Sequence, residues 1–252
     1  MQNAGRASNY TERVGLIRKR ELMAEATANN SWLKRRVEGA LRSGLTRAYE
    51  TIRVDPEQYL FHLRAAHELS VESYDGLFTL PVERLDAVAD QTVRASMKLA
   101  AAEGAGFGLG GVLTIVPDLG ILAAITMRTL QKLSLIYGFQ FNSDEEVAEL
   151  WIAAASAAGV DITRDLLEKG VLKRFIPRVI QKIAVSASAE FVEKWSARLI
   201  PLVSSGVGAA LNYYFVRTWG NRAQEHFRQK HLESREQRKQ RVILLPPSEQ
   251  QP

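Results

Sequence analysis

Residues 103–138 read EGAGFGLGGVLTIVPDLGILAAITMRTLQKLSLIYG, and this stretch decides the fold. It holds five glycines within eight positions, and no charged residue falls between Gly104 and Val116. A glycine costs an ordinary helix about 0.5–1 kcal/mol relative to alanine, so five together need a compensating gain. The glycines are Gly104, Gly106, Gly108, Gly110 and Gly111. In a helix, Gly104 with Gly108 and Gly106 with Gly110 would form two overlapping pairs, a spacing that lets the backbones of two helices approach closely.

The apolar run is divided by Pro117 and Asp118, after which apolar residues continue to Met127. A helix needs about 20 apolar residues to cross a bilayer, so neither part is long enough to span singly. We expect the two parts to form a hairpin that enters and returns, with its break at Pro117 and Asp118. In a soluble fold, Asp118 would instead occupy the first turn of the helix after Pro117, where the helix dipole favours an anion.

A second apolar run, LIPLVSSGVGAALNYYFV, covers residues 199–216 and lies between Arg198 and Arg217. It contains a similar set of helix-breaking, small and polar residues, namely Pro201, Gly206, Gly208 and Asn212. The sequence therefore predicts an all-α, multi-helix domain built around two glycine-containing apolar helical hairpins, with no sheet.

Helix signals elsewhere divide the chain into three parts. Apolar residues recur at threes and fours from Ser31 to Ile52, in a helix that would either lie on a membrane surface or pack into a core. Short polar residues and prolines predict helix starts at Asp55, Pro81 and Ser143, with two further helices at 161–169 and 178–199 separated by Gly170 and Pro177. We predict a basic N-terminal extension with an amphipathic helix (1–56), a helical domain (57–228) and a polar, largely disordered C-terminal tail (229–252).

Charge is concentrated at the two ends of the chain. The formal net charge is +5, of which residues 1–55 contribute +5 (11 Lys/Arg, 6 Asp/Glu) and residues 217–252 contribute +4 (8 and 4), leaving −4 for the middle. Basic ends suit an anionic surface, and we assign that contact to Lys34, Arg35 and Arg36. Anionic lipid is the expected partner rather than nucleic acid, because the basic stretches lack interleaved aromatic residues. Without an apolar run of signal-peptide length near residue 1, we expect the cytoplasmic side of the membrane.

No catalytic or metal-binding pattern emerges. There is no cysteine, and the four histidines form two pairs spaced by five, His62 with His67 and His226 with His231, which do not share a helical face. The glycine run lacks the Lys-Ser/Thr ending of a phosphate-binding loop. Glu103, Asp118 and Arg128 border the apolar core, as do Asn212 and Arg217. Structural pairing is the preferred role for the first three, and a polar lining or a hydrolytic acid and base are the alternatives. We expect no metal and no cofactor.

The ordered pattern of these features resembles the EcsC protein family. It comprises Pro81-Val82-Glu83-Arg84-Leu85-Asp86, KLAAAEGAGFGLGG at 98–111, Pro117-Asp118, Arg128, Tyr137-Gly138 and the segment 201–217 with Gly206, Gly208 and Asn212. The resemblance covers about residues 57–228. It implies an all-helical, bacterial, membrane-associated protein with relatives beside transporter components or among membrane-acting effectors, and it supplies no catalytic residue.

The leading hypothesis is a non-enzymatic protein of the cytoplasmic membrane. It would insert or pack its hairpins as an accessory of a membrane complex, such as a transporter, or act as a pore-like effector after forming a homo-oligomer through the glycines. The alternatives are a soluble helical module that binds a lipid-like ligand and an unrecognised hydrolase using Glu103 or Asp118.

Overall fold

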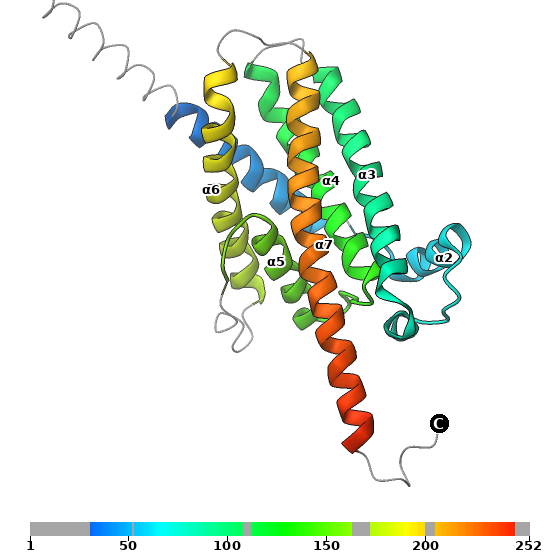
Figure 1. Ribbon diagram of the computed structural model, residues 1–252. Coiled ribbons are helices and arrows are strands. Elements are labelled where there is room, and N and C mark those ends of the chain that lie inside the picture. The colour runs from blue at the N-terminus through cyan, green and yellow to red at the C-terminus, as the bar shows by residue number, and fades with distance from the viewer. Residues whose placement is uncertain (1–30, 52, 108–111, 163–171, 200–204, 245–252) are drawn as a thin grey trace, which may run out of the picture.

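The computed structural model describes residues 31–51, 53–107, 112–162, 172–199 and 205–244, and their regular secondary structure is entirely helical (Figure 1). The side chains of 105–118, 172–173, 194–199, 205–208, 211 and 242–244 are outside this description. The predicted all-α class is therefore confirmed. The helices cover residues 31–51, α2 (Pro56–His67), a short 3-10 helix (Tyr74–Thr79), α3 (Val82–Phe107), α4 (Val112–Ile136), α5 (Asp144–Ala157), α6 (Leu172–Leu199) and α7 (Ser205–Leu244).

Polar caps begin two of these helices as predicted. The Asp55 carboxylate accepts a hydrogen bond from the Gln58 backbone N–H at 3.0 Å and opens α2. Ser143 and Glu146 form a reciprocal capping box that opens α5. Each cap supplies a partner to backbone N–H groups that the first helical turn leaves without one.

Proline does not interrupt the helices where the sequence predicted. Pro117 and Asp118 lie within α4, and Pro177 lies within α6, so both predicted breaks are wrong. Each proline is the sixth residue of its helix. The carbonyl that its ring crowds, four residues earlier, therefore belongs to the first described turn of the helix.

The predicted disordered tail from residue 229 is also wrong as far as Leu244, because α7 continues to that residue. Its last third contacts the segment before α3. The Arg235 guanidinium donates to the Leu80 carbonyl oxygen at 3.2 Å, and Arg238 donates to Asp75 at 2.8 Å. The Arg238 guanidinium also lies 4.2 Å from the centre of the Phe78 ring. Residues 245–252 are outside the described part of the chain.

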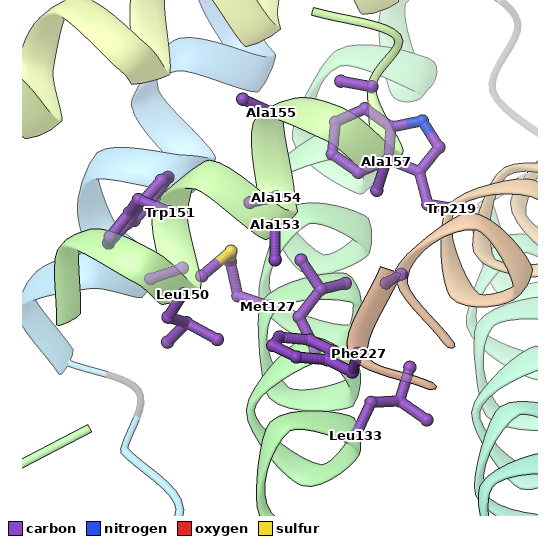
Figure 2. Packing of buried hydrophobic residues seen from close by; sticks show 14 of the residues in the cluster. Met127, Leu133, Leu150, Trp151, Ala153, Ala154, Ala155, Ala157, Trp219 and Phe227 are labelled. Atoms are coloured by element: carbon purple, nitrogen blue, oxygen red, sulfur yellow. The ribbon is translucent and has the colours of Figure 1, made fainter. Parts of the chain in front are cut away.

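The core is one cluster of buried apolar side chains from α3, α4, α5, α6 and α7, completed by the helix over residues 31–51. Figure 2 shows Met127 and Leu133 of α4 and Trp219 and Phe227 of α7 beside the alanine-rich α5, with Trp151 on its other side. The ring of Tyr49, from the helix over 31–51, meets the Trp151 ring edge-on at 5.8 Å. The core-packing interpretation of that helix therefore applies, since Val37, Leu41, Leu45 and Ala48 are buried.

Close helix contact through glycine occurs, but at residues that the sequence analysis did not select. A Cβ atom on Gly44 would lie 2.9 Å from the Gly120 Cα, which brings the helix over 31–51 against α4. A Cβ on Gly220 of α7 would lie 2.9 Å from a methyl carbon of Val93 on α3. Both contacts place backbone where a side chain would otherwise stand.

We predict that Gly44→Ala lowers the free energy of unfolding by about 1–3 kcal/mol, because the new methyl group overpacks the contact with Gly120 and Ala123. Gly39→Ala, on the same helix, is the matched control, since a Cβ there meets no atom within 4 Å. We expect it to raise stability by about 0.5–1 kcal/mol through helix propensity. Urea unfolding monitored by circular dichroism measures both, and equal shifts would contradict the close contact.

Candidate functional site

The described residues of both apolar runs include helix ends that lie at one end of the bundle. Figure 1 shows α3 and α6 ending, and α4 and α7 beginning, at the top of the view. We call this the hairpin end and define it as residues 100–107, 112–120, 192–199 and 205–212. In its α3, α4 and α7 parts the charged residues are Glu103 and Asp118. The α6 part carries Glu193, Lys194 and Arg198, so the scarcity of charged residues is confined to the other three helices.

Three large apolar side chains are exposed at matching depths below this end. Leu99 is 53% exposed, Ile121 37% and Tyr213 41%. Each stands eight or nine residues from the end of its own helix. At 1.5 Å per residue, the three lie about 12–14 Å along their helices from the hairpin end. Exposed apolar residues at a common level on three helices are typical of a surface that meets another apolar phase.

The structure places the predicted glycines and prolines only in part. Gly104 is buried in α3, Gly106 lies in the last turn of α3, and Gly206 and Gly208 lie in the first turn of α7. Gly108, Gly110, Gly111 and Pro201 are outside the described residues. Each predicted glycine pair includes one of these, so glycine pairing in the first hairpin stays a prediction.

The polar residues that border the apolar core belong to three helices, α3, α4 and α7. Asp118 and Arg128 are ten residues apart on the continuous helix α4, about 15 Å. Arg128 and Arg217 are exposed, Glu103 is half-buried on α3, and Asn212 is buried on α7. The side chain of Asp118 is outside the described residues, so pairing among Glu103, Asp118 and Arg128 stays a prediction.

The predicted basic contact residues lie near the start of the first described helix. Arg35 and Arg36 are exposed and Lys34 is half-buried. The Arg36 guanidinium lies 5.3 Å from the centre of the Trp32 ring, which is itself exposed. The opposite face of this helix is buried in the core, so the helix is fixed to the bundle with its arginines turned outward.

A polar cluster that the sequence analysis missed holds α7 against α3 and α4. The Tyr137 hydroxyl donates to the Asp86 carboxylate at 2.7 Å, and Arg228 Nε donates to the same carboxylate at 3.0 Å. Burial and the adjacent Asp86 carboxylate raise the pKa of the Tyr137 phenol. His231 lies beside this cluster, with Nδ1 2.9 Å from the Tyr137 carbonyl oxygen and its ring stacked on Phe78. The sequence offered only isolated residues, because these four positions are up to 145 residues apart.

This cluster has a structural role and does not form a catalytic site. Its carboxylate is occupied by a phenol and a guanidinium, and a nucleophile beside a free base is missing from the cluster. Within the described residues, no group of three or more His, Asp or Glu side chains could hold a metal ion.

One helix among the described residues is long and apolar enough to cross a membrane. It is the Leu119–Ile136 part of α4, with a mean hydropathy of 1.3, and 67% of it is buried inside the bundle. A buried core helix of a soluble protein has the same composition, so this helix alone does not establish a membrane span.

Comparison with known proteins assigns the chain to a family. The pattern of the EcsC protein family matches residues 45–232, which is most of the chain. The chain belongs to this family. The match begins earlier than the resemblance in the sequence indicated, so it includes the end of the first described helix. The named relative is Protein EcsC of Bacillus subtilis (strain 168), 28% identical over 155 residues that make up 59% of this chain and 64% of that protein. No solved structure shows significant similarity.

The buried imidazole of His231 predicts a loss of stability in acid. Burial lowers its pKa, and its Nε2 has no hydrogen-bond partner among the described residues. Since Nδ1–H donates to the Tyr137 carbonyl, protonation would add a buried, unpaired N–H at Nε2. The unfolded chain therefore binds the proton more readily, and the stability contributed by neutral His231 is lost as pH falls below the unfolded value of about 6.5.

Urea unfolding at pH 7.5 and pH 5.5 measures this loss. We expect the stability difference between the two pH values to shrink in His231→Phe, which keeps a ring against Phe78 but cannot be protonated. His62→Phe on the exposed face of α2 is the control; it removes only the repulsion that His62 exerts on His67, whose pKa is lowered first by burial, so most of the wild-type difference should remain. An unchanged difference in His231→Phe would contradict the assignment.

Proposed function

We propose that this EcsC family member is a non-catalytic protein of the cytoplasmic face of the membrane, whose hairpin end enters one leaflet of the bilayer. The observation that carries the proposal is the common level of Leu99, Ile121 and Tyr213 below an end where α3, α4 and α7 are almost uncharged. Tyrosine is suited to the boundary between hydrocarbon and headgroups, because its ring is apolar and its hydroxyl polar.

The dimensions favour entry into one leaflet over a complete crossing. The hydrocarbon core of a bilayer is about 30 Å thick, so one leaflet contributes about 15 Å. The level of the three exposed residues, about 12–14 Å from the hairpin end, fits that half thickness. Lys98 on α3 is exposed directly before Leu99, and Arg217 on α7 follows Tyr213 by about one turn. Their long side chains can reach the headgroups from this level.

We further propose that the protein acts as an accessory of a membrane complex rather than as a pore. A pore requires several helices that span the bilayer with apolar faces toward lipid. In this fold the apolar surface of α4 is largely covered by its own bundle. The hairpin end is what remains for contact with lipid or with an embedded partner such as a transporter.

The bundle interior gives little support to the rival role of a soluble lipid carrier. The apolar cavity between α4, α6 and α7, beside Leu122, Phe191 and Phe215, has a volume of about 20 Å³. That volume accommodates about one water molecule, whereas ligand sites generally occupy several hundred Å³. An acyl chain would therefore need this part of the core to open.

Flotation with phosphatidylcholine vesicles tests entry of the hairpin end. We expect the double variant Leu99→Asp and Tyr213→Asp to reduce the bound fraction at least about tenfold, because charges replace apolar groups at the lipid boundary. Phe61→Asp is the matched control, since Phe61 is 71% exposed but lies on α2, away from the hairpin end (Figure 1). Equal effects of both changes, or wild-type protein that stays with the soluble fraction, would refute the proposal.

A substitution at Glu103 tests the same proposal independently, because it should increase the fraction of protein bound to vesicles. Glu103 stands four residues before the end of α3, about 6 Å, and is half-buried. If this level enters hydrocarbon, Glu103→Gln should increase the fraction bound to neutral vesicles at pH 7, since an amide costs less to transfer than a carboxylate. Glu83→Gln, at the other end of α3, should leave it unchanged. No increase in Glu103→Gln would place Glu103 outside the bilayer.

A further inference from the structure

An open groove of about 610 Å³ runs between the helix over residues 31–51 and α4. Its floor is the contact between Gly44 and Gly120, where the absence of side chains lets the two backbones meet. Arg35 and Arg36 stand at one end of the groove and Arg47 at the other. The eleven residues from Arg36 to Arg47 span about 16 Å of helix.

The groove has a positive character that no described carboxylate neutralises. Among the described residues that line it there is no Asp or Glu. Among the described residues, no carboxylate is within ion-pair distance of Arg35, Arg36 or Arg47. The nearby Glu38 and Arg42 are instead both bonded to Gln181 of α6, which directs them away from the groove. Guanidinium groups bind phosphate oxygens in a bidentate manner, so a phosphate group is the complementary ligand.

The groove is also continuous with the apolar surface of the hairpin end. Its α4 wall is made of Ile121 and Ala124, and Ile121 is one of the three exposed residues that mark the proposed lipid boundary. A headgroup held by the arginines would therefore have an apolar path toward the hairpin end for its acyl chains. A soluble phosphate compound would leave that wall uncovered.

Other occupants fit the charge less well. Residues 1–30 of this chain carry five Lys/Arg and three Asp/Glu, a net charge of +2, so their overall charge is repelled by the arginines. A second copy related by twofold symmetry would bring the same three arginines opposite one another.

We propose that this groove binds one anionic phospholipid, with Arg35, Arg36 and Arg47 supplying the positive charge around its headgroup and Ile121 and Ala124 lying along its acyl chain. The site rests on the proposed membrane role and gives it a lipid preference. Entry of the hairpin end would supply attachment to any bilayer, while the groove selects anionic lipid at the headgroup level.

Two variants test the groove by different means in the full chain. The first variant replaces Arg35, Arg36 and Arg47 with Gln. Its control replaces three exposed arginines outside the groove, Arg53, Arg64 and Arg178, with Gln and so removes the same charge. The second, Gly39→Leu, keeps all the arginines and fills the groove. A Cβ at Gly39 meets no atom within 4 Å, so the bundle should fold. Ala66→Leu on the exposed face of α2 is its control.

The probe is dihexanoyl phosphatidylglycerol below its critical micelle concentration, measured by calorimetry, with dihexanoyl phosphatidylcholine and inorganic phosphate as comparisons. We expect the wild type to prefer the anionic lipid over both, and each groove variant to bind it at least about tenfold more weakly, as expected for charge-assisted phosphate contacts. The two controls should bind as the wild type does.

Several outcomes would overturn the proposal. These are absence of phosphatidylglycerol binding, full binding by Gly39→Leu, equal loss in the control arginine variant, or equal affinity for inorganic phosphate, which would indicate a soluble ligand. Because this assay uses dissolved lipid, it is independent of bilayer entry. Flotation with neutral vesicles, in which groove variants should behave as wild type, reports on the proposed function separately.

Discussion

The antiparallel packing of α7 on α3 is the contact on which the rest of the structure depends. It is the most extensive contact between two of the labelled helices. Gly220 lets the α7 backbone approach Val93, and below this point Gln224 donates to Asp90 and Arg228 to Asp86. Because the two helices run in opposite directions, the end of α3 and the beginning of α7 must lie together. Each belongs to a different apolar run, so this one contact assembles the hairpin end from segments about a hundred residues apart.

Local signals were sufficient to predict the helices, but not where the chain turns between them. Asp55 and Ser143 cap helices because their partners are three residues away, which a sequence displays directly. The predicted breaks at Pro117 and Pro177 are wrong because a proline's cost depends on its distance from the helix start, which the sequence does not show. Residues 229–244 were misread for another reason. Their composition is polar, but contacts with Leu80 and Asp75, more than 150 residues earlier, hold that part of α7 to the bundle.

The sequence was sufficient to predict several of the residues that belong to the candidate site, but not how the fold arranges them. The sequence indicates that the two apolar runs and Lys34, Arg35 and Arg36 have a role beyond the core, but it cannot say that the runs meet at one end. The glycines that do permit close packing, Gly44 and Gly220, stand alone in polar sequence and form no repeated pair. Arg47 was passed over for the same reason, since only the fold brings it to the groove that Arg35 and Arg36 line.

The burial of α4 changes which part of the sequence argues for a membrane. Taken alone, its long apolar stretch suggests a spanning helix, yet the bundle already accounts for most of that apolarity as core. What the core does not explain is the exposed part, Leu99, Ile121 and Tyr213, and the scarcity of charge above them. Soluble folds gain nothing from exposing large apolar groups at one level on three helices, whereas a protein that rests in one leaflet does. The proposed lipid contact therefore rests on about 12–14 Å of α3, α4 and α7 at the hairpin end, and not on the length of α4.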